Sequence, residues 1–137
     1  MTECLITVNP AIGCRLPPKK AKEMQVLTQD EIKRFLIQAN EEGYYEFFLL
    51  ELTTGMRRGE ILGLQWKDVN FATGELHIRR QVVKKGAQTQ ITKPKTKSSI
   101  RTLILPPDML NILVEHKKTA TCEWVFPSPV KEGEPRN

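Results

Sequence analysis

Residues that build redox and metal sites are scarce in this chain of 137 residues, which has three cysteines and two histidines. Cys4, Cys14 and Cys122 lack the C-x-x-C or Cys/His spacing of a zinc site, and an odd number argues against a disulfide framework, so we expect free thiols and no metal. No apolar run approaches the roughly 20 residues of a membrane helix, and residues 1–20 lack the apolar core of a secretory signal. We therefore expect a cytoplasmic protein that does not bind a membrane.

Acidic residues are missing from one stretch of a chain whose charges are otherwise mixed. The net charge is +5, which by itself says little about partners. Between residues 79 and 101, however, there is no Asp or Glu, and the basic residues are Arg79, Arg80, Lys84, Lys85, Lys93, Lys95, Lys97 and Arg101. Such a one-sided charge distribution predicts a polyphosphate partner such as a nucleic acid.

The length and the 39% share of hydrophobic residues fit one small domain with its own core. A capping box marks the start of the first predicted helix, because Thr28 can cap the helix while the Glu31 side chain reaches back to the Thr28 backbone. Apolar periodicity then predicts a helix over about 29–41. Further helices are expected over 45–52, which is apolar around most of its circumference, over 58–64 and over 107–118.

Alternating apolar residues replace the helical pattern after Glu75. Leu76, Ile78, Arg80 and Val82 fall on one face of a predicted strand that ends before the turn at 84–86. A second strand at about 88–93 and a third at 101–105 complete a small antiparallel meander, and residues 124–127 form a possible short strand. The predicted fold class is therefore α+β, with N-terminal helices followed by a three-stranded antiparallel sheet and a further helix.

The segment 54–69, TGMRRGEILGLQWKDV, closely resembles the first arginine box of tyrosine recombinases of the phage integrase family. By this resemblance Arg57 holds a non-bridging oxygen of the scissile DNA phosphate, and Glu60 braces its guanidinium from behind. The chemistry is suitable, because a planar guanidinium can bind a phosphate through two hydrogen bonds and neutralise its charge. Without the resemblance, paired arginines at a helix start would more simply be a solvated surface.

The segment 92–106, TKPKTKSSIRTLILP, resembles the lysine hairpin of the same family. The resemblance implies that Lys95 acts as the general acid toward the leaving 5′-hydroxyl. Lys97 remains an alternative, because it is two residues away on the same side of an extended chain. Arg79, Lys93, Lys97 and Arg101 are expected to bind the DNA backbone, although a lysine-rich edge can also serve only to prevent strand aggregation.

The family's other catalytic parts, a His-x-x-Arg helix and the tyrosine nucleophile, are expected downstream of a segment like the one that ends this chain. His77 and Arg80 match His-x-x-Arg only by spacing, because residues three apart on a strand face opposite sides. Tyr44 and Tyr45 begin a buried-looking helix and are better explained as core or boundary residues than as the nucleophile. Residues 1–26 are expected to be the end of a core-binding domain and a linker, and residues 27–137 the first part of a catalytic domain.

The resemblance implies DNA integration and recombination through a 3′-phosphotyrosyl intermediate, with double-stranded DNA as partner and without a metal or other cofactor. Full-length relatives form tetramers on DNA, whereas this piece is expected to be monomeric and inactive alone. Two other classes of function stay open. The chain could be a non-catalytic DNA-binding module, or a basic structural or interaction domain in which replacing Arg57 leaves nucleic-acid binding unchanged.

Overall fold

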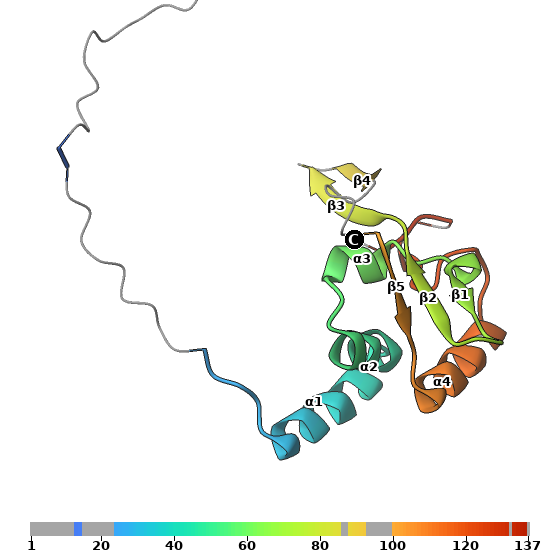
Figure 1. The fold of residues 1–137 in the computed structure, drawn as a ribbon, viewed down its shortest axis with the longest axis horizontal. Coiled ribbons are helices and arrows are strands. Elements are labelled where there is room, and N and C mark those ends of the chain that lie inside the picture. The colour runs from blue at the N-terminus through green and yellow to red at the C-terminus, as the bar shows by residue number, and fades with distance from the viewer. Residues whose placement is uncertain (1–12, 15–23, 86–87, 93–99, 132, 137) are drawn as a thin grey trace, which may run out of the picture.

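The structure is a computed structural model that describes residues 13–14, 24–85, 88–92, 100–131 and 133–136. Its helices are α1 (Gln29–Glu41), α2 (Tyr45–Thr54), α3 (Arg58–Leu62), the 3-10 helix η1 (Trp66–Asp68) and α4 (Pro107–Lys118). Its strands are β1 (Val69–Asn70), β2 (Glu75–Ile78), β3 (Gln81–Lys85), β4 (Gln88–Thr92) and β5 (Arg101–Ile104). Figure 1 shows α2 and α3 beside the strands, α1 next to α2 on the side away from the strands, and α4 at one end of the sheet. The α+β fold class is confirmed.

The helices begin where the capping signals predict. The Thr28 backbone N–H donates to Glu31 Oε2 at 2.7 Å, and the Glu31 N–H donates to Thr28 Oγ1 at 3.4 Å, so the capping box at the start of α1 is formed. Helix α4 has the predicted bounds, with Pro107 at its first position. Helix α2 is less buried than predicted, since Phe47 and Leu50 are buried while Leu52 remains 48% exposed.

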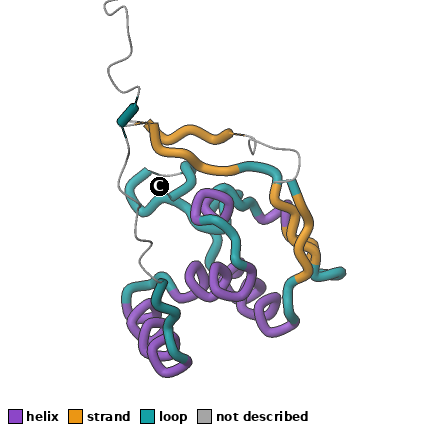
Figure 2. Tube along the Cα trace, turned by 60° about the vertical axis from the view of Figure 1, so that its left-hand side comes forward, coloured by secondary structure: helices purple, strands orange, loops and turns teal. Residues whose placement is uncertain are grey.

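The strands form two sheets, which corrects the predicted meander. The order β1-β2-β5 makes a three-stranded antiparallel sheet, and among the described strands β3 pairs with β4 alone, in a separate hairpin. The predicted first strand is interrupted at residues 79–80, so its first half pairs with β5 and its second half with β4. Figure 2 shows the hairpin and the three-stranded sheet as separate sets of strands around the helices. The segment 124–127 contributes two isolated bridges instead of a strand, one between Gln65 and Trp124 and one between Pro127 and Pro135.

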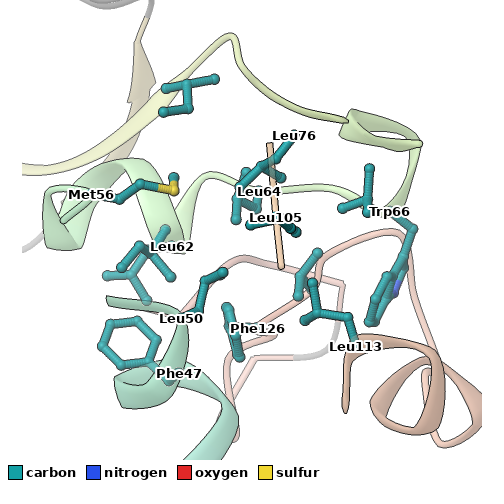
Figure 3. Packing of buried hydrophobic residues seen from close by; sticks show 14 of the residues in the cluster. Phe47, Leu50, Met56, Leu62, Leu64, Trp66, Leu76, Leu105, Leu113 and Phe126 are labelled. Atoms are coloured by element: carbon teal, nitrogen blue, oxygen red, sulfur yellow. The ribbon is translucent and has the colours of Figure 1, made fainter. Parts of the chain in front are cut away.

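One hydrophobic core lies between the helices and the three-stranded sheet. It takes side chains from α2, α3, η1, β1, β2, β3, α4 and the segments that follow them, and Figure 3 shows most of these side chains. The members are Phe47, Leu50, Met56, Ile61, Leu62, Leu64, Trp66, Val69, Leu76, Ile78, Val82, Leu105, Met109, Leu113, Val125 and Phe126. Within the described ranges, no helix is both long and apolar enough to cross a bilayer.

Two glycines let α3 approach the backbone of the chain around β3. A Cβ at Gly59 would stand 2.6 Å from the Val82 carbonyl oxygen, and one at Gly63 would stand 3.1 Å from that of Arg80. Real side chains essentially never come as close as the first of these values. Helix α3 is therefore seated on β3 at a distance that only glycine permits at position 59.

Replacing Gly59 with alanine tests this close approach. In an unhindered helix, alanine stabilises by about 0.5–1 kcal/mol relative to glycine. Here the new methyl group meets a backbone oxygen that cannot move aside alone, so we expect Gly59→Ala to lower the free energy of unfolding by roughly 1–3 kcal/mol. Urea denaturation followed by circular dichroism measures the change, with Asn40→Ala on the exposed side of α1 as control. A stability gain for Gly59→Ala would show that the helix has room to shift.

Candidate functional site

Arg57 lies at the junction between α2 and α3. Gly55 ends α2 in the left-handed conformation with φ of 61°, and its N–H donates to the Glu51 carbonyl at 2.8 Å. The chain then becomes extended at Arg57, the residue that caps the start of α3. The neighbouring Met56 side chain enters the core, while the Arg57 side chain is 73% exposed. The turn thus anchors the backbone and presents the guanidinium to solvent.

Glu60 is the buried centre of the site. Its side chain is 2% exposed and accepts hydrogen bonds from two arginines. The Arg57 N–H donates to Oε2 at 3.1 Å, and Arg57 Nη1 donates to Oε1 at 3.2 Å. One carboxylate therefore holds both the backbone and the side chain of Arg57, three residues earlier in the chain.

Arg101 approaches the same carboxylate from β5. Its Nη1 lies 3.2 Å from Glu60 Oε1, and its Nη2 lies 3.0 Å from Glu60 Oε2, so the two groups meet fork to fork. The Arg101 side chain is 31% exposed. The structure thus brings three sequence-predicted site residues, Arg57, Glu60 and Arg101, into one cluster that carries one negative and two positive charges.

Two opposing effects act on the Glu60 carboxyl. Burial raises its pKa, but the hydrogen bond and the charge of Arg101, together with the hydrogen bonds from Arg57, outweigh burial and bring the pKa below its ordinary value. Glu60 is therefore ionised at neutral pH, and the cluster keeps a net charge of about +1.

A second buried carboxylate repeats this arrangement. Asp68 Oδ2 accepts from the Gln65 N–H at 3.0 Å and from Arg80 Nη1 at 2.6 Å, while Arg80 Nη1 also lies 3.3 Å from the Gly63 carbonyl. Sequence reasoning did not find this pair. The signal was present, because an arginine on the inward face between Ile78 and Val82 requires a buried acidic partner.

The other predicted site residues are spread along the basic stretch. Lys93, Lys95 and Lys97 lie outside the described residues. Arg79 is exposed at the link between β2 and β3. Direct DNA contacts by any of these four residues remain predictions.

Two alternative motifs are also placed by the structure. His77 Nδ1 lies 2.9 Å from Thr102 Oγ1, whereas Arg80 pairs with Asp68, so His77 and Arg80 do not face a common site. Tyr44 precedes α2 and lies under the Arg136 guanidinium at 4.2 Å, which fits the predicted boundary role. Among the described residues, no group of three or more His, Cys, Asp or Glu could hold a metal ion.

The pKa of Glu60 predicts how stability depends on pH. A carboxyl with a lowered folded-state pKa contributes stability that is present above its unfolded pKa, about 4.3, and is lost as the pH falls through the folded value. We expect Glu60→Gln to lower the free energy of unfolding at pH 7 by roughly 1–3 kcal/mol, because two arginines lose their counter-charge.

Chemical denaturation at pH 7 and near pH 3 measures this effect. The difference between wild type and Glu60→Gln should shrink at the lower pH, because pH 3 lies below the unfolded pKa of about 4.3 and the unfolded chain then takes up a proton at Glu60 more readily than the folded one. Glu41→Gln, at an exposed position of α1, serves as the control for loss of one acidic charge. An equal difference at both pH values would contradict a stabilising Glu60 charge.

Comparison with curated proteins finds recombinases and integrases. The chain is 32% identical over 130 residues to a XerC-like tyrosine recombinase of Caldanaerobacter subterraneus, covering 84% of this chain and 33% of that protein. It is 30% identical over 118 residues to the ICEBs1 integrase of Bacillus subtilis, covering 85% of this chain and 32% of the integrase. The chain thus spans about a third of the length of these relatives.

Solved structures share the fold. A structure of the Tn1549 transposon integrase in complex with transposon right-end DNA matches with a TM-score of 0.78 and 21% identity, over 96% of this chain and 47% of that one. The XerA recombinase matches with a TM-score of 0.56 and 22% identity, over 89% of this chain and 40% of that one.

The arginine box, its buried glutamate and the α+β fold all lie within residues 25–135, which match the sequence model of the phage integrase family. This match covers most of the chain and agrees with the curated relatives. The chain belongs to the phage integrase family and forms part of the catalytic domain of a tyrosine recombinase.

Proposed function

We propose that this chain is the part of a recombinase catalytic domain that binds a DNA phosphate, with Arg57 as the residue that contacts a non-bridging oxygen. The observation that carries the proposal is an exposed guanidinium fixed from behind by a buried carboxylate. In the described part of the chain, Arg57 uses one side-chain nitrogen, Nη1, to donate a hydrogen bond to Glu60. A guanidinium has five N–H donors, so enough remain to bind a phosphate through two hydrogen bonds.

The charge of the site supports an anionic ligand. Glu60 neutralises one of its two arginines, which leaves an excess of about one positive charge beside a partly exposed surface. Lys84 and Lys85 are exposed on the neighbouring hairpin strand β3, and Arg79 is exposed at its base. In the proposed complex, these exposed cations bind further phosphates of the duplex that Arg57 contacts.

Within the longer protein, we propose that this site supports DNA integration and recombination through a 3′-phosphotyrosyl intermediate. Arg57 would neutralise charge developing on the phosphate, and Lys95 would protonate the leaving 5′-hydroxyl, with Lys97 as the alternative donor. Lysine suits that role because an arginine side chain hardly releases a proton. Arg79, Lys93 and Lys97 would bind neighbouring phosphates.

The activity is proposed for the longer protein because the chain spans only about a third of the length of its curated relatives. The Tn1549 integrase structures of the same fold contain DNA. A phosphate that is held without an attacking nucleophile is not cleaved, so we expect the chain alone to bind DNA without cutting it. A tetramer on DNA is proposed for the longer protein, and a monomer for this chain.

Fluorescence anisotropy with a short duplex DNA across a salt series tests the proposal. We expect weak binding that falls steeply with salt, because phosphate contacts release counterions. Arg57→Ala should weaken binding about tenfold, the loss of roughly 1.4 kcal/mol expected for a charged hydrogen-bonded contact, and should reduce the salt slope by about one. Lys95→Ala should weaken binding less, since its main proposed role is proton transfer.

Two control variants separate specific from general charge effects. Arg57→Lys keeps the charge but loses the planar fork, so it should recover the salt slope and only part of the affinity. Arg34→Ala removes the same charge from an exposed position of α1 and should leave affinity nearly unchanged. If Arg57→Ala and Arg34→Ala have equal effects, binding depends on net charge alone, as in a basic structural domain.

A further inference from the structure

Arg101 was expected to contact DNA, yet its terminal nitrogens are already committed to Glu60. Nη1 and Nη2 lie 3.2 and 3.0 Å from the two carboxylate oxygens, which is the fork-to-fork arrangement of a strong ion pair. The pair joins residues 41 positions apart in the sequence. It is therefore a tertiary contact that connects β5 to the first turn of α3.

The position of Arg101 is fixed by strand pairing. Arg101 lies opposite Ile78 in the antiparallel register of β2 and β5, and Ile78 is buried in the core. The backbone that carries Arg101 is thereby held against the three-stranded sheet. Glu60 is in turn held by the backbone N–H of Arg57. A continuous set of hydrogen bonds runs from the sheet through Arg101 and Glu60 to Arg57.

This geometry controls how Arg57 can use its own guanidinium. Because the Arg101 fork spans both oxygens of Glu60, Arg57 reaches the carboxylate side on, through Nη1 and Oε1. Without Arg101, Glu60 would be a buried charge whose remaining arginine partner among the described residues is Arg57. Coulomb attraction would then draw the Arg57 fork onto the carboxylate and away from an external phosphate.

We propose that Arg101 is a positioning residue, which holds Glu60 so that Arg57 presents its guanidinium to the DNA phosphate, and that Arg101 is not itself the phosphate contact. This inference rests on the proposed function of Arg57. It assigns Arg101 a role different from that of the exposed cations Arg79, Lys84 and Lys85, which have no such buried partner among the described residues.

A double-mutant cycle on DNA binding provides the first test. The four proteins are wild type, Arg57→Ala, Arg101→Gln and the double variant, all as the full 137-residue chain with the same short duplex. If Arg101 acts through Arg57, Arg101→Gln weakens binding about three- to tenfold in the wild-type background and hardly further in the Arg57→Ala background. If the two losses multiply, Arg101 contacts DNA independently and the proposal is wrong.

A second measurement does not depend on DNA. The Nε–Hε signal of Arg57 in nitrogen-15 NMR reports the environment of its guanidinium. We expect Arg101→Gln to shift this signal, because Arg57 changes its contact with Glu60. An unchanged signal overturns the proposal. If the wild type binds no DNA, the proposed function fails, while the NMR result still decides whether Arg101 positions Arg57.

Three matched variants distinguish positioning from loss of stability or charge. Arg80→Lys weakens the other buried arginine–carboxylate pair, which contacts Asp68 and not Glu60, so it should leave the Arg57 signal in place. Arg34→Gln removes one exposed positive charge and should also leave it in place. Arg101→Lys keeps a charge beside Glu60 and should partly restore both the signal and the affinity; it replaces Arg101→Gln if that variant does not fold.

Discussion

The carboxylate of Glu60 is buried and ionised, and a buried charge is costly unless it is paired and hydrogen-bonded. This requirement connects parts of the chain that local structure leaves independent. The turn after α2 supplies Arg57, α3 supplies Glu60 and β5 supplies Arg101. If any of the three were displaced, the carboxylate would lose part of its compensation. The relative placement of helix, turn and strand is therefore set by one charged group and not by apolar packing alone.

Apolar packing fixes the surroundings of this cluster. Ile61 and Leu62 follow Glu60 into the core, while Gly59 lets the opposite side of α3 rest against the backbone of β3. Asp68 and Arg80 pin the end of η1 to the link between the two sheets. The short helix is thus restrained on several sides, which a helix of five residues needs because its own hydrogen bonds cannot stabilise it.

Local signals in the sequence predicted the helices well. The Thr28–Glu31 capping box and Pro107 mark helix starts through interactions within a few residues, so a sequence pattern can reveal them. The interruption between β2 and β3 was not predictable in the same way. Ile78, Arg80 and Val82 still point inward at every second position across residues 79–80. A period of two fits one long strand as well as two short strands, so the pattern does not reveal the interruption. Strand β1, with only two residues, leaves no periodic signal at all.

In the site, too, the contacts between residues close in sequence were predictable and the contacts between distant residues were not. The arginine box placed Arg57 and Glu60 three residues apart, and their contact follows from helix geometry. The basic stretch marked Arg101 as a cation, but composition cannot say which carboxylate a side chain will meet across 41 residues. The lysines at 93, 95 and 97 lie outside the described residues, so their predicted roles rest on the sequence.

The separation of the two sheets has a consequence for how this domain can diverge in sequence. Within the described strands, β3 pairs with β4 alone, while β2 and β5 keep their own register. Residues added or lost at the tip of the hairpin therefore do not shift the β2–β5 pairing that carries Arg101. The fold therefore allows the length and composition of the hairpin to change, and with them the surface that the hairpin presents to a DNA groove. The cluster of Arg57, Glu60 and Arg101 is not displaced by such changes.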